Sequence, residues 1–153
     1  MSLRHKSTPA SAEHAPLQLE HFLPYRLSIL SNTISQAIAD DYQSRHDLSV
    51  TEWRVMAVLA RFEGLSAREV AERTAMDKVA VSRALARLVA AGRVDRAVHD
   101  SDKRRSVLKL SAAGWAIHDD VAPMARARER EVLAKLDAEE RQWLERILDK
   151  LLA

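Results

Sequence analysis

The chain has 153 residues, of which 47% are apolar, 5% aromatic and 30% charged, and its formal net charge is +2. It contains no cysteine, which excludes a disulfide scaffold, a cysteine zinc site, an iron–sulfur cluster and a thiol nucleophile. Its three glycines are far apart, which excludes the glycine-rich loops that hold nucleotide phosphates. No apolar run approaches the roughly 20 residues that span a membrane, and the polar start lacks the apolar stretch of a signal peptide. We therefore expect a soluble, cytoplasmic protein of one compact domain, or of one small module with an appendage, that needs no cofactor and no membrane.

The small net charge conceals an uneven distribution along the chain. Residues 61–109 contain twelve basic and seven acidic side chains, a net charge of +5, which leaves −3 for the rest of the chain. A basic centre between acidic flanks favours a polyanion as the partner of the centre. Chance clustering on a solvated surface is the alternative explanation of the same charges.

The first 48 residues predict a tail followed by one long helix. Residues 1–16 are rich in Ser, Ala, His and Pro and are expected to be disordered. From Leu17 to Arg45 the apolar residues recur at steps of three and four, which is typical of an amphipathic helix. Pro24 is tolerated near the start of that helix, and residues 46–48 interrupt the pattern.

Two shorter helices are expected next. Ser49 or Thr51 begins the first of them, and Glu63-Gly64 ends it. Ser66 begins a short helix, and Glu69, three residues later, completes a capping box.

A further helix is expected from Asp77, its N-terminal cap, to Ala91, with Gly92 as the glycine that follows its end. Its apolar stripe is expected to face the two preceding helices and consists of Val81, Leu85, Leu88 and Val89. The period then changes from helical to two, with apolar residues around 94–98 and 107–110 on either side of a polar, basic stretch. This pattern predicts a β-hairpin with a basic tip.

The remaining residues predict two helices. Ser111 begins a fifth helix, in which Gly114 is interpreted as a mild cost in the first turn and Pro123 is expected to cause a kink. Asp137 and Glu140 cap the last helix, whose apolar stripe consists of Trp143, Leu144, Ile147, Leu148, Leu151 and Leu152.

The middle of the chain has the layout of a winged helix–turn–helix: helix, short helix, tight turn, amphipathic helix and basic hairpin. With the apolar stripe buried, the other side of the amphipathic helix presents short or basic side chains that reach base edges and phosphates in a major groove. The helical residues expected to contact DNA are Ser66, Arg68, Lys78, Val79, Ser82, Arg83 and Arg87. At the hairpin tip, Lys103, Arg104 and Arg105 are expected to reach an adjacent minor groove, with Asp102 orienting a guanidinium. Ordinary solvated positions and a soluble turn are the alternatives when each group is taken alone.

The run Glu52–Ser111 resembles the MarR family of winged-helix transcriptional regulators. The wing carries the family pattern D-[RK]-R-x-x-x-L-x-L-[ST]-x-x-G from Asp102 to Gly114, and the entry to the wing, His99-Asp100, departs from the Asp-Pro that is frequent there. The helical stretches that carry the resemblance are Leu48–Met56, Leu65–Ala71 and Asp77–Leu88. The resemblance covers about Leu19 to Leu152.

The resemblance implies a mainly α fold with six helices and a β-hairpin wing. Residues 17–48 and 112–153 would form a dimerisation layer, and residues 49–111 the DNA-binding domain. It further implies a homodimer on a pseudo-palindromic operator in double-stranded DNA, most commonly a repressor, which a small phenolic or aromatic carboxylate releases. The one-sided apolar stripes of the first and last helices independently favour dimerisation. A pocket for the carboxylate is expected near Trp53, with Arg54 as its ion-pair partner and His46 as a second polar group; Trp53 as a core residue and Arg54 as a solvated one is the alternative.

Two other classes of function fit less well. An enzyme would need a catalytic or metal-binding motif, and neither a GxSxG nucleophile nor an HxxxH pair is present. The His118-Asp119-Asp120 cluster consists of adjacent helical positions, which do not converge on one metal. A winged-helix module that binds only proteins would not need the basic wing tip. A steep loss of duplex binding with salt would distinguish a DNA-binding protein from such a module.

Overall fold

The structure, a computed structural model, describes residues 14–99 and 102–153, and the side chains of residues 99 and 102–105 lie outside its description. The chain divides into two units, residues 1–33 and 34–153. Most of the predicted tail, residues 1–16, therefore lies outside the described residues. No helix in the described residues has both the length and the apolar character needed to cross a membrane.

The first long helix begins later than the sequence predicts. A 3-10 turn, η1 (Leu19–His21), comes first, Phe22 is extended, and helix α1 runs over Leu23–His46. Pro24 has no N–H with which to continue an upstream helical ladder, so the regular helix begins beside it. The predicted break is confirmed, because Asp47 takes a left-handed conformation with φ 48°.

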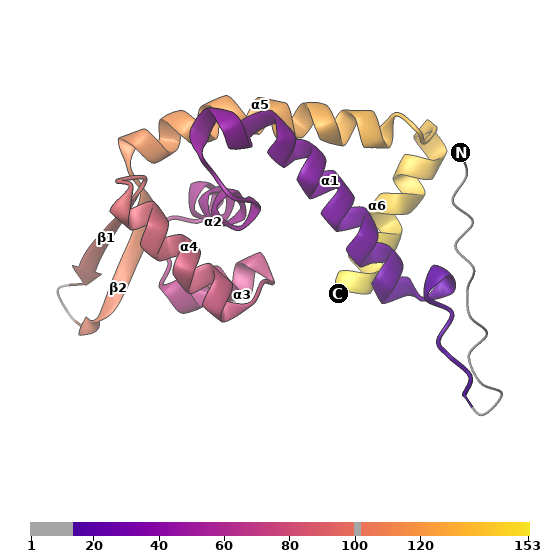
Figure 1. Ribbon diagram of the computed structural model, residues 1–153, viewed down its shortest axis with the longest axis horizontal. Helices are drawn as coiled ribbons and strands as arrows, with labels where there is room; N and C mark the ends of the chain where they lie inside the picture. The colour runs from indigo at the N-terminus through magenta and orange to yellow at the C-terminus, as the bar shows by residue number, and fades with distance from the viewer. Residues whose placement is uncertain (1–13, 100–101) are drawn as a thin grey trace. The chain divides into compact units, whose positions relative to one another are not determined.

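Helices α2 (Val50–Arg61), α3 (Ala67–Thr74) and α4 (Lys78–Ala90) follow (Figure 1). Their side-chain caps are local, as predicted: Ser49 caps α2, Ser66 and Glu69 form the capping box of α3, and Asp77 caps α4. Helices α2, α3 and α4 all contact one another and share one core, and α2 also contacts α5.

The hairpin consists of β1 (Val94–His99) and β2 (Asp102–Leu110), paired antiparallel with Val94 opposite Leu110. A third segment joins it at the base, because the Leu108 N–H donates to the Leu65 carbonyl at 2.8 Å and the Gly64 N–H donates to the Leu108 carbonyl at 3.3 Å. Gly64 has φ +78°, a conformation that glycine adopts without strain. The sequence pattern predicted the two strands but not this bridge, which ties the hairpin to the loop before α3.

Helices α5 (Ala112–Leu133) and α6 (Ala138–Leu152) complete the chain, with Ser111 and the Asp137–Glu140 capping box at their starts as predicted. Helix α5 continues through Pro123.

Gly114 has a different role from the one inferred from the sequence. It is buried, and a Cβ at this position would overlap the carbonyl oxygen of Arg93 and lie 3.3 Å from a Leu110 methyl. The glycine is therefore a requirement of the close approach between α5 and the base of the hairpin, where the Ser111 N–H donates to that same carbonyl at 3.1 Å.

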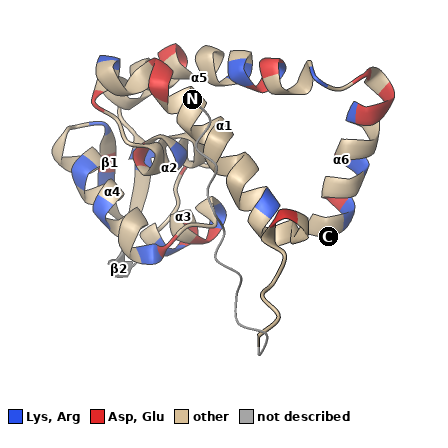
Figure 2. Cartoon of the chain, turned by 45° about the vertical axis from the view of Figure 1, so that its right-hand side comes forward, with Lys and Arg blue, Asp and Glu red and all other residues tan. Residues whose placement is uncertain are grey.

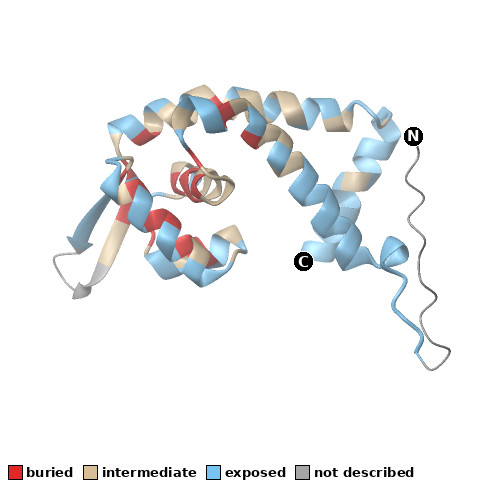
Figure 3. Ribbon diagram, in the orientation of Figure 1, coloured by how far each residue is buried: buried red, intermediate tan, exposed pale blue. Residues whose placement is uncertain are grey.

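One apolar core joins α2, α3, α4, the hairpin base and parts of α1 and α5 (Figure 3). Three members of the predicted stripe of α4 are buried, with Val81 and Leu85 at 1% and Leu88 at 0% exposure, and the fourth, Val89, is partly buried against the same core. The other large side chains that are fully buried are Tyr42, Val55, Met56, Leu59, Val70, Val94, Leu108 and Val121. The core therefore fixes which face of α4 turns outward.

Candidate nucleic-acid interface

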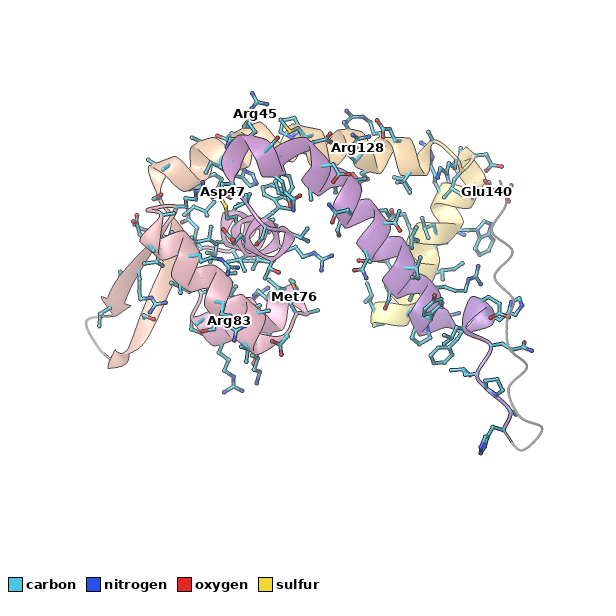
Figure 4. The ribbon with its side chains drawn as sticks, viewed as in Figure 1. Arg45, Asp47, Met76, Arg83, Arg128 and Glu140 are labelled. Atoms are coloured by element: carbon cyan, nitrogen blue, oxygen red, sulfur yellow. The ribbon has the colours of Figure 1, made fainter. Side chains whose placement is uncertain are left out.

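The outward face of α4 is polar and basic. Lys78, Val79, Ser82 and Arg83 are all exposed in the N-terminal half of the helix, and α4 contains three basic residues and no acidic residue. Figure 2 shows Lys and Arg at several positions along α4, and Figure 4 labels Arg83 in its middle. Asp77 satisfies the Ala80 N–H at 2.9 Å, so the first turn is well ordered, and the positive end of the helix dipole lies at the same end as Lys78. These features suit contact with a phosphate backbone and with base edges.

Ser66 and Arg68, at the start of α3, have local partners. The Ser66 hydroxyl accepts from the Glu69 N–H at 3.2 Å, and the Ser66 N–H donates to the Glu69 carboxylate at 2.7 Å. Arg68 is exposed and its Nε lies 3.0 Å from a carboxylate oxygen of Glu72. Ser66 therefore has a structural role as a helix cap, whereas the surface ion pair of Arg68 is of the weak kind that a phosphate can replace.

Arg87 is linked to a residue that sequence reasoning missed. Its Nε donates to Glu52 Oε1 at 3.0 Å, joining α4 to the start of α2, and the Glu52 oxygen also accepts from the Ser49 hydroxyl at 2.9 Å. Glu52 is the buried charged residue of the described core, at 7% exposure, whereas the Arg87 side chain is 57% exposed. The Ser-x-x-Glu spacing from Ser49 to Glu52 was a signal for the local part of this arrangement. Its long-range part, the bond to Arg87, has no local signal.

A pocket of about 440 Å³ lies beside this ion pair. It is lined by Gln43, Asp47, Leu48, Ser49, Glu52, Arg87, Ala91 and Arg93. Arg93, one of these lining residues, donates to the His46 carbonyl at 2.5 Å and to the Asp47 carbonyl at 3.4 Å. The turn between α4 and β1 is thus hydrogen-bonded to the end of α1 and the residue after it.

The hairpin contributes exposed positions on both strands. Arg96 on β1 and Lys109 on β2 are exposed. The predicted tip residues Asp102, Lys103, Arg104 and Arg105 belong to β2 by their backbone, but their side chains lie outside the described part of the structure.

The three residues predicted to bind a carboxylate are in different local environments. The Trp53 ring has two aromatic neighbours, Tyr42 at a centroid distance of 6.0 Å and His118 at 5.8 Å. Arg54 donates to the Ser35 hydroxyl at 2.7 Å, and the His46 Nε2 is 2.7 Å from an Asp120 carboxylate oxygen. The structure therefore places Trp53 in an aromatic cluster and gives the other two residues polar protein partners.

The same junction of α1 with α5 contains two perturbed groups. Burial raises the pKa of Tyr42 to about 12, and its hydroxyl has no hydrogen-bond partner among the described residues. The Arg128 guanidinium donates two hydrogen bonds, of 2.7 and 2.8 Å, to the Asp41 carboxylate, and this pairing lowers the pKa of the Asp41 carboxyl. No group of three or more potential metal ligands occurs in the described residues. The features of this junction are those of a packed structural joint.

Comparison with known proteins gives the geometry a context. A model of the MarR family matches residues 46–105, which span α2 to the wing. An HTH-type transcriptional repressor of Mycobacterium tuberculosis is 30% identical over 141 residues, which cover 92% of this chain and 96% of the relative. The homoprotocatechuate degradative operon repressor of Escherichia coli is 25% identical over 109 residues, 71% of this chain and 74% of the relative.

The fold is shared with solved structures as well. A mutant MarR of Escherichia coli, crystallised with operator DNA, superposes with a TM-score of 0.75 and 26% identity over 91% of this chain and all of the other. The predicted fold of six helices and a two-stranded antiparallel wing is confirmed. The family match, the similarity over nearly the whole length and the shared fold together show that the chain belongs to the MarR family and is a DNA-binding transcriptional regulator, not an enzyme.

Proposed function

We propose that the protein is a homodimeric repressor that binds a pseudo-palindromic operator by inserting α4 into the major groove. The observation that carries this proposal is the division of α4 into two faces. Val81, Leu85 and Leu88 are buried, whereas Lys78, Ser82 and Arg83 are exposed near the N-terminus of the helix.

Each exposed residue of α4 suits a different part of DNA. Arg83 has the planar fork that binds the O6 and N7 atoms of guanine, and Ser82 pairs with any base edge. Lys78 lies in the first turn, where its charge and the helix dipole both favour a phosphate. The Arg87 side chain is 57% exposed although it is bonded to Glu52, so it can contact a phosphate while Glu52 keeps it in position. The basic residues of the wing tip, of which Arg104 is the middle one, are assigned to the adjacent minor groove.

The test is a footprint across the region upstream of the protein's own gene, followed by titration of the protected duplex by fluorescence anisotropy. Arg83→Ala and Arg104→Ala should each weaken binding by roughly 5- to 150-fold, the range for loss of a specific groove contact. Arg130→Ala, which changes an exposed arginine of α5, is the matched control and should leave affinity unchanged. Equal losses of affinity in all three variants would mean that binding depends only on nonspecific charge. Wild-type affinity of Arg83→Ala would mean that α4 does not contact the operator.

A second copy of the chain is proposed as the partner of the terminal helices. In α6, Trp143, Ile147, Leu148, Leu151 and Leu152 are between 38% and 83% exposed although the helix is amphipathic. In the first unit, Phe22, Leu23, Leu27 and Leu30 are 40–52% exposed. Apolar stripes of this extent favour self-association, and a pseudo-palindromic operator needs one DNA-binding domain for each half-site.

Light scattering during gel filtration tests the dimer. Ile147→Lys with Leu151→Lys should give a monomer or an aggregate, because two charges then replace apolar contacts. Glu145→Lys, on the polar side of the same helix, is the control and should stay dimeric. Removal of residues 137–153 should act like the double substitution, and a soluble dimer of unchanged melting temperature would contradict the assignment.

We also propose a small phenolic or aromatic carboxylate as effector. The E. coli relative is named for the degradation operon of a phenolic acid, which supports the class of compound. Around Trp53 such a ligand has to compete with the partners of Arg54 and His46. The pocket beside Arg87 has the volume for it, and a carboxylate there would compete with Glu52 for the Arg87 guanidinium.

Titration with salicylate-like and hydroxycinnamate-like acids distinguishes the two positions. Loss of operator binding in wild type but not in Arg87→Lys places the acid beside Arg87. Loss accompanied by Trp53 quenching, and retained in Arg87→Lys, places it at Trp53. No change in operator affinity up to millimolar acid refutes the effector.

A further inference from the structure

Val79 is an exposed apolar residue in a polar surface. Within residues 49–98 and 106–111, the large apolar side chains that are exposed are Val79, at 56%, and Val98, at 60%. Val79 is the second residue of α4, beside Lys78, and it shares the outward face with Ser82 and Arg83, which follow at helical spacings of three and four.

Exposure of one valine is ordinary on a protein surface, so the position of Val79 carries the argument rather than its exposure. In the proposed complex, the outward face of α4 enters the major groove, so its side chains are the ones that can reach base edges. Val79 is the large apolar side chain of that face. A β-branched residue has a lower helix propensity than alanine, and exposure of its two methyl groups to water is unfavourable. Both costs are offset if the side chain packs against an apolar group of the DNA.

We propose that Val79 is a specificity residue that packs against the C5-methyl of a thymine in each half-site. This inference rests on the proposed function. The thymine methyl is the apolar group that the base pairs of unmodified DNA present in the major groove, and cytosine, adenine and guanine present polar atoms there. Exchange of that thymine for another base therefore leaves the Val79 methyls against a polar edge or against water.

The spacing of α4 gives the inference a second consequence. Val79 and Arg83 are four residues apart, which is about 6 Å along the helix axis. Base pairs of duplex DNA are about 3.4 Å apart, so the two side chains reach base pairs that are one or two steps apart. The operator is expected to carry a guanine for Arg83 within two base pairs of the thymine read by Val79.

The test uses the duplex that the wild-type protein selects from a random library, with each thymine replaced in turn by deoxyuridine. That replacement removes the methyl alone and keeps the base pair. At one thymine in each half-site, the wild-type protein should bind the uridine duplex about fourfold more weakly, the value for one methyl-sized group returned to water. Val79→Ala should bind the thymine duplex more weakly than wild type and should make no distinction between thymine and uridine there.

Val98→Ala is the matched control, because it truncates an equally exposed valine on β1 and should retain the full preference for thymine. Unchanged circular-dichroism melting of Val79→Ala separates the contact from folding. The inference is overturned if no thymine is sensitive to loss of its methyl, or if Val79→Ala keeps the sensitivity of wild type. If the wild-type protein selects no sequence, the proposed function itself fails, and the inference falls with it.

Discussion

Substitution of Gly114 by alanine should destabilise the protein, although alanine is the better helix former. In an open helix the exchange gains about 1 kcal/mol. Here the new methyl would overlap the Arg93 carbonyl oxygen and crowd Leu110, and the oxygen is part of the peptide backbone at the base of the wing. The clash can be relieved only by moving α5 away from the hairpin.

The expected magnitude follows from these opposing effects. Overpacking of a buried site costs about 1–3 kcal/mol. Movement of α5 also weakens the bond from the Ser111 N–H to the Arg93 carbonyl, with a cost of about 1 kcal/mol. After the gain in helix propensity, a net loss of about 1–3 kcal/mol remains, and each kcal/mol lowers the melting temperature by roughly 2–4 °C in a chain of this size.

Thermal and urea unfolding of Gly114→Ala measure this loss. Ala116→Gly is the companion variant, because Ala116 is exposed in the same helix and its exchange should follow propensity alone, with a loss of about 1 kcal/mol. Both variants should therefore be less stable than wild type, for opposite reasons. A Gly114→Ala protein that melts above wild type would refute the close approach described for α5 and the hairpin.

Three further outcomes are expected. Leu85→Ala should lower the free energy of unfolding by about 2–5 kcal/mol, whereas Ser82→Ala should leave it nearly unchanged; the reverse order in urea titrations would show that the phase of α4 is wrong. Tyr42→Phe should raise stability by up to about 1 kcal/mol in thermal melts, because it removes a buried hydroxyl without a described partner. Because the pKa of Tyr42 is raised to about 12, wild type should also lose stability as the pH rises from 10 to 12, and a phenylalanine variant with the same alkaline loss would contradict this cause. Arg128 holds the pKa of the Asp41 carboxyl below 3.8, so the stability that this pair adds is present above pH 3.8 and is lost as the pH falls further. Asp41→Asn should therefore make the free energy of unfolding less sensitive to acid, and an unchanged acid profile would show that the pair contributes nothing.

Features encoded by neighbouring residues could be predicted from the sequence. The capping boxes of α3 and α6 and the cap of α4 each depend on residues three positions apart, so their spacing is visible in the printed chain. The burial of Leu85 and the exposure of Ser82 follow from the helical period in the same way. The side of α4 that is proposed to face DNA was assigned from that period alone.

Features that join distant residues could not be predicted. Glu52 and Arg87 are 35 positions apart, and Asp41 and Arg128 are 87 apart, so no local pattern pairs them. Gly114 was misinterpreted for the same reason, because the atom that excludes a side chain there belongs to Arg93. The packing of Trp53 was the alternative to its role in an effector site, but its aromatic neighbours could not be named from the sequence, since they come from α1 and α5.

The hairpin is held at its base, where Leu65 and Arg93 bind the strand that leads into α5. The residues that form the core and the residues proposed to select the target sequence therefore lie in different parts of the chain. A longer, shorter or differently charged arm could be inserted between Val98 and Ser106, and the exposed side chains of α4 other than Arg87, which is bonded to the buried Glu52, could be exchanged without changing the buried residues. If the proposed interface is correct, new operator sequences should be recognised after exchange of α4 surface residues and of the wing, with the core kept unchanged.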